Sequence, residues 1–439
     1  MTGRGRRRPT VVEIGLAALV VLLLGALWGW RSDGRAPAPA DLRALPARAT
    51  APEITLLTDE AIRRLAGREF AEACERFSEA AARAPESVAL RGNVARCFGD
   101  WGWQALRAGR AEEAIQLFRQ GLAVSPAGED LLKGLGVAAV HAGRADLAIA
   151  PLARLVRAQP DGEATILLAR LYDQRDEGTQ AVTLLRRFLA VHPADVEARR
   201  LLDKLTREST AEAGFRKVET AHFVLKARGD GDAEIRRTVL ATLERLYADI
   251  GGALGRYPAE KILVILYPAG RFQEVTGTHD WVSGLFDGKI RLPAGALALP
   301  RPALARVLAH EGTHAIVHQI ARGRAPRWLQ EGLAQHFEGV VDEDLLELPQ
   351  GLTLAGVEAL LTSGDVAKAR TGYRTALWLV RDLLERGGVP TITELLTRLG
   401  SGEPVTTAVE RVYGLPLPRL EAQWRLVLGG PADADSAAR

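Results

Sequence analysis

The longest apolar stretch of the chain lies near its N-terminus. Residues 14–30 contain no charged side chain, and two valines extend the run beyond Glu13. A stretch of this length is just sufficient to cross a bilayer as a helix. Arginines precede it, and Trp28 and Trp30 end it where an interfacial aromatic belt would lie. This arrangement is typical of a helix whose N-terminal end stays in the cytoplasm.

We therefore expect a basic cytoplasmic tail at residues 1–10 and a single transmembrane anchor at residues 11–30. The bulk of the chain would then lie on the periplasmic side of the inner membrane. The alternative is a cleaved signal peptide, whose best small-x-small site is A-P-A at residues 38–40. That site lies well beyond the apolar run, which favours the anchor. Residues 31–55 are rich in Pro and Ala and predict a semi-extended linker.

Between residues 56 and 206 the apolar pattern repeats with a helical period. Similar helical segments are closed by Pro85, Pro126, Pro160 and Pro193, and the first interval between these prolines is wider than the two that follow. Two of the second helices open alike, with GRAEEAI at residue 109 and GRADLAI at residue 143. The wide first interval predicts a longer helix near residues 99–107, and residues 196–206 predict a closing helix.

This pattern resembles tetratricopeptide repeats, whose unit is a helix–turn–helix of about 34 residues. The period is well matched, although the early Trp and Tyr positions of the consensus are mostly absent. Repeats of this kind usually present a concave surface that binds a peptide or another protein. The resemblance thus implies that residues 56–206 recruit a protein partner, and a spacer without a ligand is the alternative.

The chain contains two cysteines, Cys74 and Cys97. They lie at nearly equal distances before and after Pro85, which marks a helix–helix turn. Positions equidistant from the turn of an antiparallel helical hairpin face each other, so a disulfide is one prediction. The other is a pair of small buried core residues.

After residue 214 strands appear among the helices. The expected strands are 222–227, 262–267 and 284–293, and the expected helices are 233–254, 303–321, 375–386 and 418–428. In the third strand Asp287, Lys289 and Arg291 alternate with uncharged neighbours, which predicts a half-exposed edge strand. This order of elements predicts an α+β core at residues 215–345 and a helical subdomain at 346–430. A disordered tail is expected at 431–439.

Composition and charge indicate how many domains the chain can form and which class of partner its charge does not favour. The chain has 439 residues, of which 47% are hydrophobic and 25% charged, enough for two or three packed domains. Its net charge of +3 resides in the N-terminal segment, because positive and negative charges balance beyond residue 30. A nucleic-acid-binding protein would show a strongly basic face, so we expect no nucleic-acid partner.

The helix expected at residues 303–321 carries the motif H-E-x-x-H. His310 and His314 are one helical turn apart, which places both imidazoles on one helix face where they can reach one Zn²⁺. Glu311 follows the first histidine and is suited to act as a general base on a metal-activated water. The pattern therefore predicts a hydrolase with Glu311 as the catalytic residue.

A second motif follows in the next expected helix. The segment RWLQEGLA carries Glu331 beyond the helix that contains His314, where it could supply a third ligand. The two motifs together resemble the gluzincins, the thermolysin-like zinc peptidases, and most closely their small bacterial "peptidase MA-like" domains. The resemblance implies that zinc binds His310, His314 and Glu331. It also implies that peptide bonds are hydrolysed through a zinc-activated water, with the substrate extended along the 284–293 edge.

The same stretch excludes one rival family. A metzincin would place Gly and His where this chain has Val317 and Ile320. His318 is two turns from His310 and too far to share one metal, so we interpret it as a packed or supporting residue. His336 is the reserve ligand.

Two further positions near the motifs concern the surroundings of the metal. Thermolysin-like sites carry an acidic residue one turn after the third ligand, where this chain has Gln335. An amide can still accept a hydrogen bond, so this departure leaves the predicted ligand set unchanged. Tyr373 is the best candidate to stabilise the tetrahedral intermediate, and packing is its ordinary role.

The overall expectation is a multidomain protein. An N-terminal transmembrane helix precedes an all-α tetratricopeptide-like solenoid, which precedes an α+β zincin metallopeptidase domain. Its function would be that of a membrane-anchored zinc peptidase whose repeats recruit substrate or partner proteins. The alternative is a repeat-based binding or envelope assembly factor whose peptidase-like domain is non-catalytic or narrowly specific.

Overall fold

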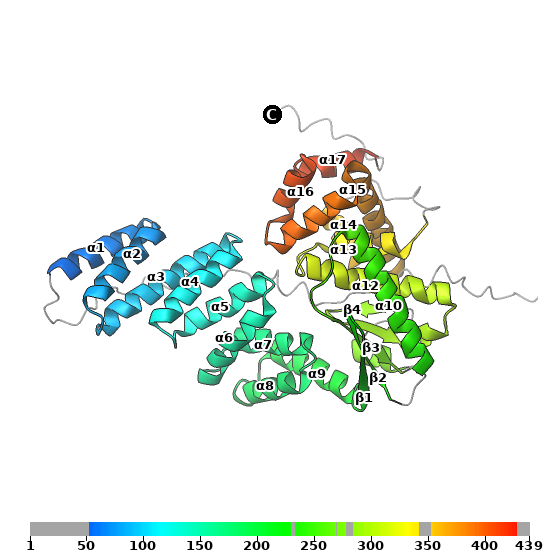
Figure 1. Ribbon diagram of the computed structural model, residues 1–439, viewed down its shortest axis with the longest axis horizontal. Helices are drawn as coiled ribbons and strands as arrows, with labels where there is room; N and C mark the ends of the chain where they lie inside the picture. The colour runs from blue at the N-terminus through cyan, green and yellow to red at the C-terminus, as the bar shows by residue number, and fades with distance from the viewer. Residues whose placement is uncertain (1–51, 230–232, 269, 278–283, 342–352, 428–439) are drawn as a thin grey trace, which may run out of the picture. The chain divides into compact units, whose positions relative to one another are not determined.

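A computed structural model describes residues 52–229, 233–268, 270–277, 284–341 and 353–427 (Figure 1). The chain divides after Leu205 into two compact units, which we call the solenoid and the C-terminal unit. The predicted cytoplasmic tail, the anchor, nearly all of the linker and the C-terminal tail lie outside the described residues. Within those ranges, no helix has the length and apolar character needed to span a membrane.

The solenoid is built from antiparallel helix pairs, as the repeat pattern predicts (Figure 1). Its helices are α1 Pro52–Ala66, α2 Phe70–Arg83, α3 Val88–Arg107, α4 Ala111–Val124, α5 Glu129–His141, α6 Ala145–Ala158, α7 Gly162–Gln174, α8 Gly178–Val191 and α9 Val196–Ala211. Each of the four prolines falls between the second helix of one pair and the next pair. Helix α3 is the long helix that the wide first interval predicts. The closing helix α9 continues beyond its predicted end, and its part after Leu205 belongs to the C-terminal unit.

Close packing of α3, α4 and α5 depends on small residues around one aromatic ring. Phe118 of α4 is fully buried in the solenoid core. A Cβ atom at Gly102 of α3 would stand 2.9 Å from its ring, and one at Gly134 of α5 would stand 2.2 Å from it. Both distances are below van der Waals contact, so these helices reach the ring only because the two positions lack side chains.

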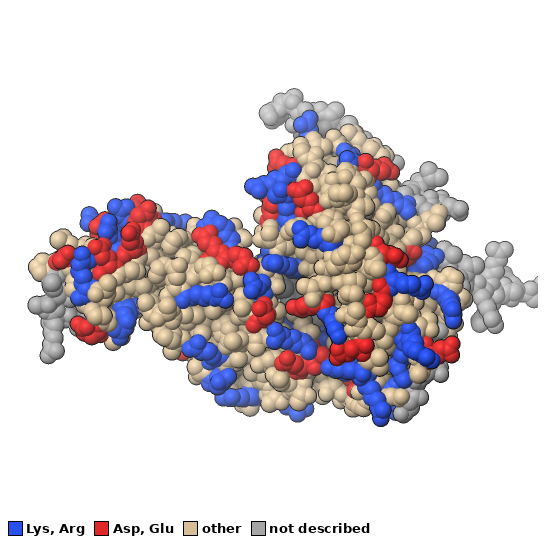
Figure 2. All heavy atoms as spheres, in the orientation of Figure 1, with Lys and Arg blue, Asp and Glu red and all other residues tan. Residues whose placement is uncertain are grey.

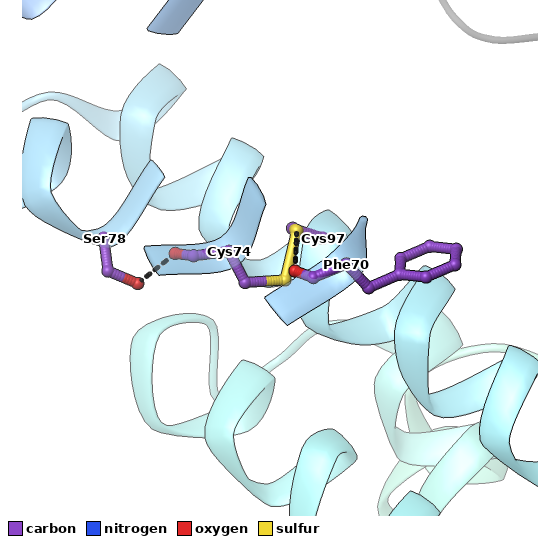
Figure 3. Close-up of a disulfide and its surroundings, with 4 residues drawn as sticks. All are labelled: Phe70, Cys74, Ser78 and Cys97. Carbon is purple, nitrogen blue, oxygen red and sulfur yellow. Dashed lines mark hydrogen bonds between the residues drawn. A yellow bond between two sulfur atoms is a disulfide. The ribbon is translucent and has the colours of Figure 1, made fainter. Parts of the chain in front are cut away.

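A disulfide joins Cys74 of α2 to Cys97 of α3, with Cα atoms 5.5 Å apart (Figure 3). The predicted disulfide is therefore present, and both cysteines are also buried in the core, as the alternative prediction expected. One turn along α2, the Ser78 hydroxyl donates to the Cys74 carbonyl oxygen at 2.7 Å (Figure 3). The bond therefore lies inside the hydrophobic contact between the first two helix pairs of the described chain.

The C-terminal unit contains a five-stranded sheet in the order β1-β2-β3-β5-β4. Its strands are β1 Phe215–Glu219, β2 Phe223–Arg228, β3 Ile262–Tyr267, β4 Leu285–Phe286 and β5 Ile290–Pro293. The three central strands β2, β3 and β5 are parallel, and both edge strands are antiparallel to their neighbours. The strand predicted at 284–293 is therefore a hairpin, and its edge is the short β4.

A tight turn at Gly288 explains why residues 284–293 form a hairpin and not the single strand that was predicted. Gly288 has φ of 99°, a conformation that favours glycine, and it follows closely on the short β4. The following strand β5 lies between β3 and β4, so its charged residues are not half-exposed as predicted. Lys289 is 4% exposed and Arg291 is 1% exposed.

Arg291 is buried because it is surrounded by acceptors, one from its own hairpin and the others from segments far away in the sequence. Its guanidinium lies 2.9 Å from Asp287 Oδ1, 3.1 Å from Glu208 Oε2 and 3.6 Å from Glu212 Oε1, and it donates to the Tyr267 hydroxyl at 2.6 Å. We call these five residues the arginine cluster. Burial alone would lower the pKa of Arg291, but the carboxylates of Asp287 and Glu208 outweigh it and raise that pKa well above its ordinary value.

Helices pack on the sheet and complete the C-terminal unit. They are α10 Ala233–Leu254, α11 Arg271–Thr276, the 3₁₀ helix η3 Ala294–Ala298, α12 Arg301–Ile320, α13 Arg327–Glu338, α14 Leu354–Leu361, α15 Val366–Gly400, α16 Val405–Tyr413 and α17 Leu417–Val427. One hydrophobic core joins β2, β3 and β5 to α10, α12, α13 and α15. Helix α15 is interrupted at Gly388, where φ is 71° and ψ is −178°. On the face drawn in Figure 2, acidic and basic side chains are intermixed.

Candidate metal centre

The H-E-x-x-H motif lies in a helix that passes through the protein interior. Helix α12 begins at Arg301 with a proline in its first turn, and every residue from Val307 to Val317 is buried. His310 is 5% exposed, and Glu311 and His314 are each 1% exposed. The motif is therefore shielded from bulk water along its whole length, which is unusual for three ionisable side chains.

The chain then reverses so that a second helix faces the motif. Arg322 and Gly323 have φ of 50° and 72° and end α12. Glu331 of α13 is brought to the two histidines and is 1% exposed. Gly332 allows α13 to lie close to α15, because a Cβ atom there would stand 2.3 Å from the Ala376 carbonyl oxygen. The third predicted ligand is thus held by a tight helix–helix contact.

The three predicted ligands converge on one point. The Nε2 atoms of His310 and His314 are 3.2 Å apart, and they lie 3.6 Å and 3.3 Å from Glu331 Oε2. One ligand atom from each residue lies within 4.8 Å of the others. We call these three residues the histidine cluster. The structure brings together the whole ligand set expected from sequence.

A carboxylate orients the first histidine, but it is not at the expected position. Glu338 Oε2 lies 3.0 Å from His310 Nδ1, and Glu338 Oε1 lies 3.5 Å from Arg306 Nη2. Gln335, where an acidic residue was expected, instead donates to the carbonyl oxygens of Glu331 and Tyr373. Glu338 lies two turns after Glu331 on the same face of α13, and that spacing is the signal that could have identified it.

The donor set fits a divalent metal such as zinc. A carboxylate can only accept, so His310 donates from Nδ1 to Glu338, and its neutral ring then presents the Nε2 lone pair to the cluster. Glu331 Oε2 is buried without a hydrogen-bond partner among the described residues. Electron pairs that converge in a buried space require a cation between them. Two imidazoles and one carboxylate, with room for one more ligand, form a typical catalytic zinc site.

The same convergence shifts the protonation of the ligands. Burial would raise the pKa of Glu331, but the His314 and His310 imidazoles outweigh it and lower that pKa to about 2. Burial would lower the pKa of His310, yet the neighbouring carboxylates of Glu331 and Glu338 raise it well above its ordinary range. A proton therefore serves as the positive charge when no metal is present, and metal binding would release it.

Glu311 is placed beside the cluster but outside the ligand set. Its burial raises its pKa from 4.5 to about 6, an effect that the neighbouring His310 and His314 only partly offset. Glu311 Oε2 has no hydrogen-bond partner among the described residues. A carboxylate with a pKa near neutrality can both accept and return a proton, as a general base must.

Three further residues singled out from the sequence, Tyr373, His318 and His336, have different surroundings in the structure. Tyr373 of α15 is buried, and the nearby Glu331 and Glu311 add to burial in raising its pKa well above its ordinary value. His318 packs edge-on against Phe286 with ring centroids 5.3 Å apart, and burial lowers its pKa to about 4. His336 is half-buried and lies outside the histidine cluster. Of the two additional histidines, neither joins the candidate metal ligands.

Comparison with solved structures finds resemblances of low identity. A crystal structure of MamA is 16% identical over 37% of this chain and 84% of its own, with a TM-score of 0.29. A tetratricopeptide repeat protein from Parabacteroides merdae is 15% identical over 65% of this chain and 93% of its own, also with a TM-score of 0.29. A repeat protein from Thermus thermophilus is 21% identical over 35% of this chain and 82% of its own, with a TM-score of 0.23.

Comparison with protein families is more specific. No curated protein shows significant similarity to the chain. Residues 100–163, from α3 to the start of α7, match the tetratricopeptide repeat. Residues 303–430, which include both motifs and the C-terminal helices, match the peptidase MA superfamily. The chain therefore carries tetratricopeptide repeats followed by a peptidase MA superfamily domain.

Proposed function

We propose that this protein is a zinc-dependent peptidase of the gluzincin type, in which His310, His314 and Glu331 hold the metal and Glu311 is the general base. The observation that carries the proposal is the buried convergence of the three ligand atoms, with Glu311 one position from the first ligand. The match of residues 303–430 to the peptidase MA superfamily supports a hydrolytic role.

Each side chain has a defined task in peptide hydrolysis. Bound zinc would supply Lewis acidity, which polarises a peptide carbonyl and acidifies water. Glu311 accepts the proton of the attacking water and delivers it to the leaving amine. Glu338 fixes the ring orientation and tautomer of His310 through the 3.0 Å contact at Nδ1. The hydroxyl of Tyr373 is our candidate to donate a hydrogen bond to the developing oxyanion.

The edge strand β4 is the proposed binding place for an extended substrate. Among the described strands, β4 pairs with β5 alone and ends the sheet, so we place an added peptide strand on its other side. Its Phe286 lies on the histidine cluster, since its ring stacks on that of His314 with centroids 6.4 Å apart. A peptide added to this edge would therefore pass beside the ligands.

The rest of the chain suggests where the peptidase works. We propose that residues 11–30 anchor it in the inner membrane with the bulk on the periplasmic side, and that the solenoid recruits substrate or partner proteins. The disulfide between Cys74 and Cys97 supports this location, because such bonds persist in oxidising compartments. The match of residues 100–163 to tetratricopeptide repeats supports protein recruitment.

Metal content tests the proposal directly. Zinc is measured by mass spectrometry in the full chain and in the Glu331→Gln, Glu311→Gln and Glu385→Gln variants. We expect Glu331→Gln to lose most of its zinc, because a ligand is removed. Glu311→Gln should keep zinc but lose cleavage of internally quenched peptides. Glu385 is exposed in the same unit, so its variant should match the wild type in both measurements.

Two results would contradict the proposal in different ways. Unchanged zinc in Glu331→Gln would exclude Glu331 as a ligand and make His336 the next candidate. A zinc-loaded wild type that cleaves no peptide in the library, with Glu311→Gln retaining every measurable function, would favour the binding or assembly role.

A further inference from the structure

The carboxylate of Glu311 lies against the α-carbon of Gly284. Gly284 immediately precedes β4 and is buried. A Cβ atom built on it would stand 2.7 Å from Glu311 Oε1, 2.8 Å from Cγ and 3.0 Å from Cδ. A side chain at position 284 and the observed position of the Glu311 side chain are therefore incompatible.

The backbone at this position does not require glycine. The φ angle of Gly284 lies outside the left-handed region, whereas Gly288 in the next turn has φ of 99°. Any L-residue could adopt the main-chain conformation of Gly284. The three described atoms nearest to a Cβ atom built on Gly284 all belong to Glu311, so the space that Glu311 occupies is the constraint at this position.

Hydrogen bonds within the described chain do not fix the direction of this carboxylate. Among the described residues, no hydrogen bond to the Glu311 side chain is present, and Oε2 is buried without a partner. Catalytic side chains are usually oriented by hydrogen bonds from a supporting residue. Here the contact with the α-carbon of Gly284 orients the Glu311 carboxylate instead.

We infer that Gly284 is a positioning residue, whose missing side chain keeps the Glu311 carboxylate between the edge strand and the histidine cluster. This inference rests on the proposed role of Glu311 as general base. Because Glu311 is long and flexible, an added methyl group would displace its carboxylate and leave the backbone in place. The fold and the ligands would then remain while the base moves.

Gly284→Ala in the full chain tests the inference, with Gly295→Ala as the matched control. A Cβ atom at Gly295 would have no neighbour within 4 Å. Turnover of internally quenched peptides by Gly284→Ala should fall in kcat by on the order of 100-fold, as expected for a base displaced by about 1 Å. KM, zinc content and melting temperature should remain those of the wild type, and Gly295→Ala should be unchanged throughout.

A crystal structure of zinc-loaded Gly284→Ala provides a measurement that does not depend on activity. We expect the Glu311 carboxylate to be displaced from its wild-type position by at least about 1 Å, while His310, His314 and Glu331 superpose. An unmoved carboxylate, a kcat within twofold of the wild type, or loss of zinc or folding would overturn the inference. If the wild type itself cleaves no peptide, the proposed function fails, and the crystal comparison still decides the role of Gly284.

Discussion

The C-terminal unit buries two groups of ionisable side chains, and they satisfy their charges in opposite ways. In the arginine cluster, three carboxylates face one guanidinium at ion-pair distances, and Glu212 also meets Lys226 Nζ at 2.6 Å. In the histidine cluster, two imidazole nitrogens and a carboxylate oxygen converge with no Lys or Arg among the described groups that meet there. The first group already contains its cations, whereas the second requires one from outside.

This difference separates a structural role from a chemical one. Burying a charge is costly unless it is paired and hydrogen-bonded. The arginine cluster meets that condition internally, and its members come from the end of α9 and the residue after it, from β3 and from the β4–β5 hairpin, so it joins three segments. The histidine cluster meets it only with a metal ion or protons. The charged side chains of both groups are at most 7% exposed, so exposure alone would not distinguish them.

The largest expected effect comes from breaking the arginine cluster. Arg291→Met should lower the free energy of unfolding by about 3–5 kcal/mol, because the carboxylates are left buried without their cation. Urea unfolding of the metal-free protein measures this loss. Arg271→Met is the matched control, since its ion pair with Glu274 is exposed and should contribute at most about 1 kcal/mol. If both variants lose equally little, the cluster is not what holds these segments together.

A smaller effect is expected from removing the carboxylate that orients the histidine cluster. Glu338→Gln should weaken zinc binding by about 10- to 100-fold, because His310 loses the negative charge that strengthens its Nδ1 hydrogen bond and makes the ring a better ligand. Competition with a chromophoric chelator gives the affinity, and Glu385→Gln again serves as the exposed control. Wild-type affinity in Glu338→Gln would show that the contact at Nδ1 does not support the metal.

The smallest expected effect concerns Glu311 in the metal-free protein. Its pKa is raised from 4.5 to about 6 in the folded state, so the folded protein holds this proton more tightly than the unfolded chain does. Stability therefore falls as pH rises from 4.5 to 6, and the full cost, on the order of 2 kcal/mol, is present above pH 6.

Glu311→Gln does not titrate and should be more stable than the wild type at pH 8 by that amount, with no difference below pH 4.5. Urea unfolding at both pH values measures the gap. Zinc should narrow it at pH 8, because a cation stabilises the carboxylate. A gap that is equal at both pH values would mean that ionisation of Glu311 is not its cause.

Strong periodicity explains which parts of the fold were predictable. The bounds of α10 and β3 agree with the sequence prediction, because one has a long amphipathic pattern and the other a continuous β-branched run. The hairpin was missed because β4 is too short to show any alternation. The burial of Arg291 was missed because Glu208 and Glu212, which pair with it, lie far earlier in the chain.

In the candidate site, too, residues related by a local pattern were predictable, and residues brought together only by tertiary structure were not. The spacing of His310 and His314 is local to one helix, so the sequence alone places them together. Glu331 was only a possible ligand from its place in the following helix, and the resemblance assigned it, since only tertiary structure brings α13 to α12. Glu338 was not predicted, because the family pattern directed attention to position 335. Gly284 carries no chemical group, and its contact with Glu311 becomes visible only when the two elements are packed.

The disulfide at the start of the solenoid has a consequence for how the repeats unfold. In a stacked array each unit is stabilised only by its neighbours, so the outermost unit frays first. Cys74 and Cys97 belong to successive helix pairs, and their bond crosses the outermost interface of the described repeats. The bond thus holds the first helix pair to the second at the end of the array where unfolding would begin. Reduction should therefore release the α1–α2 pair to hydrogen exchange before the pairs that follow it.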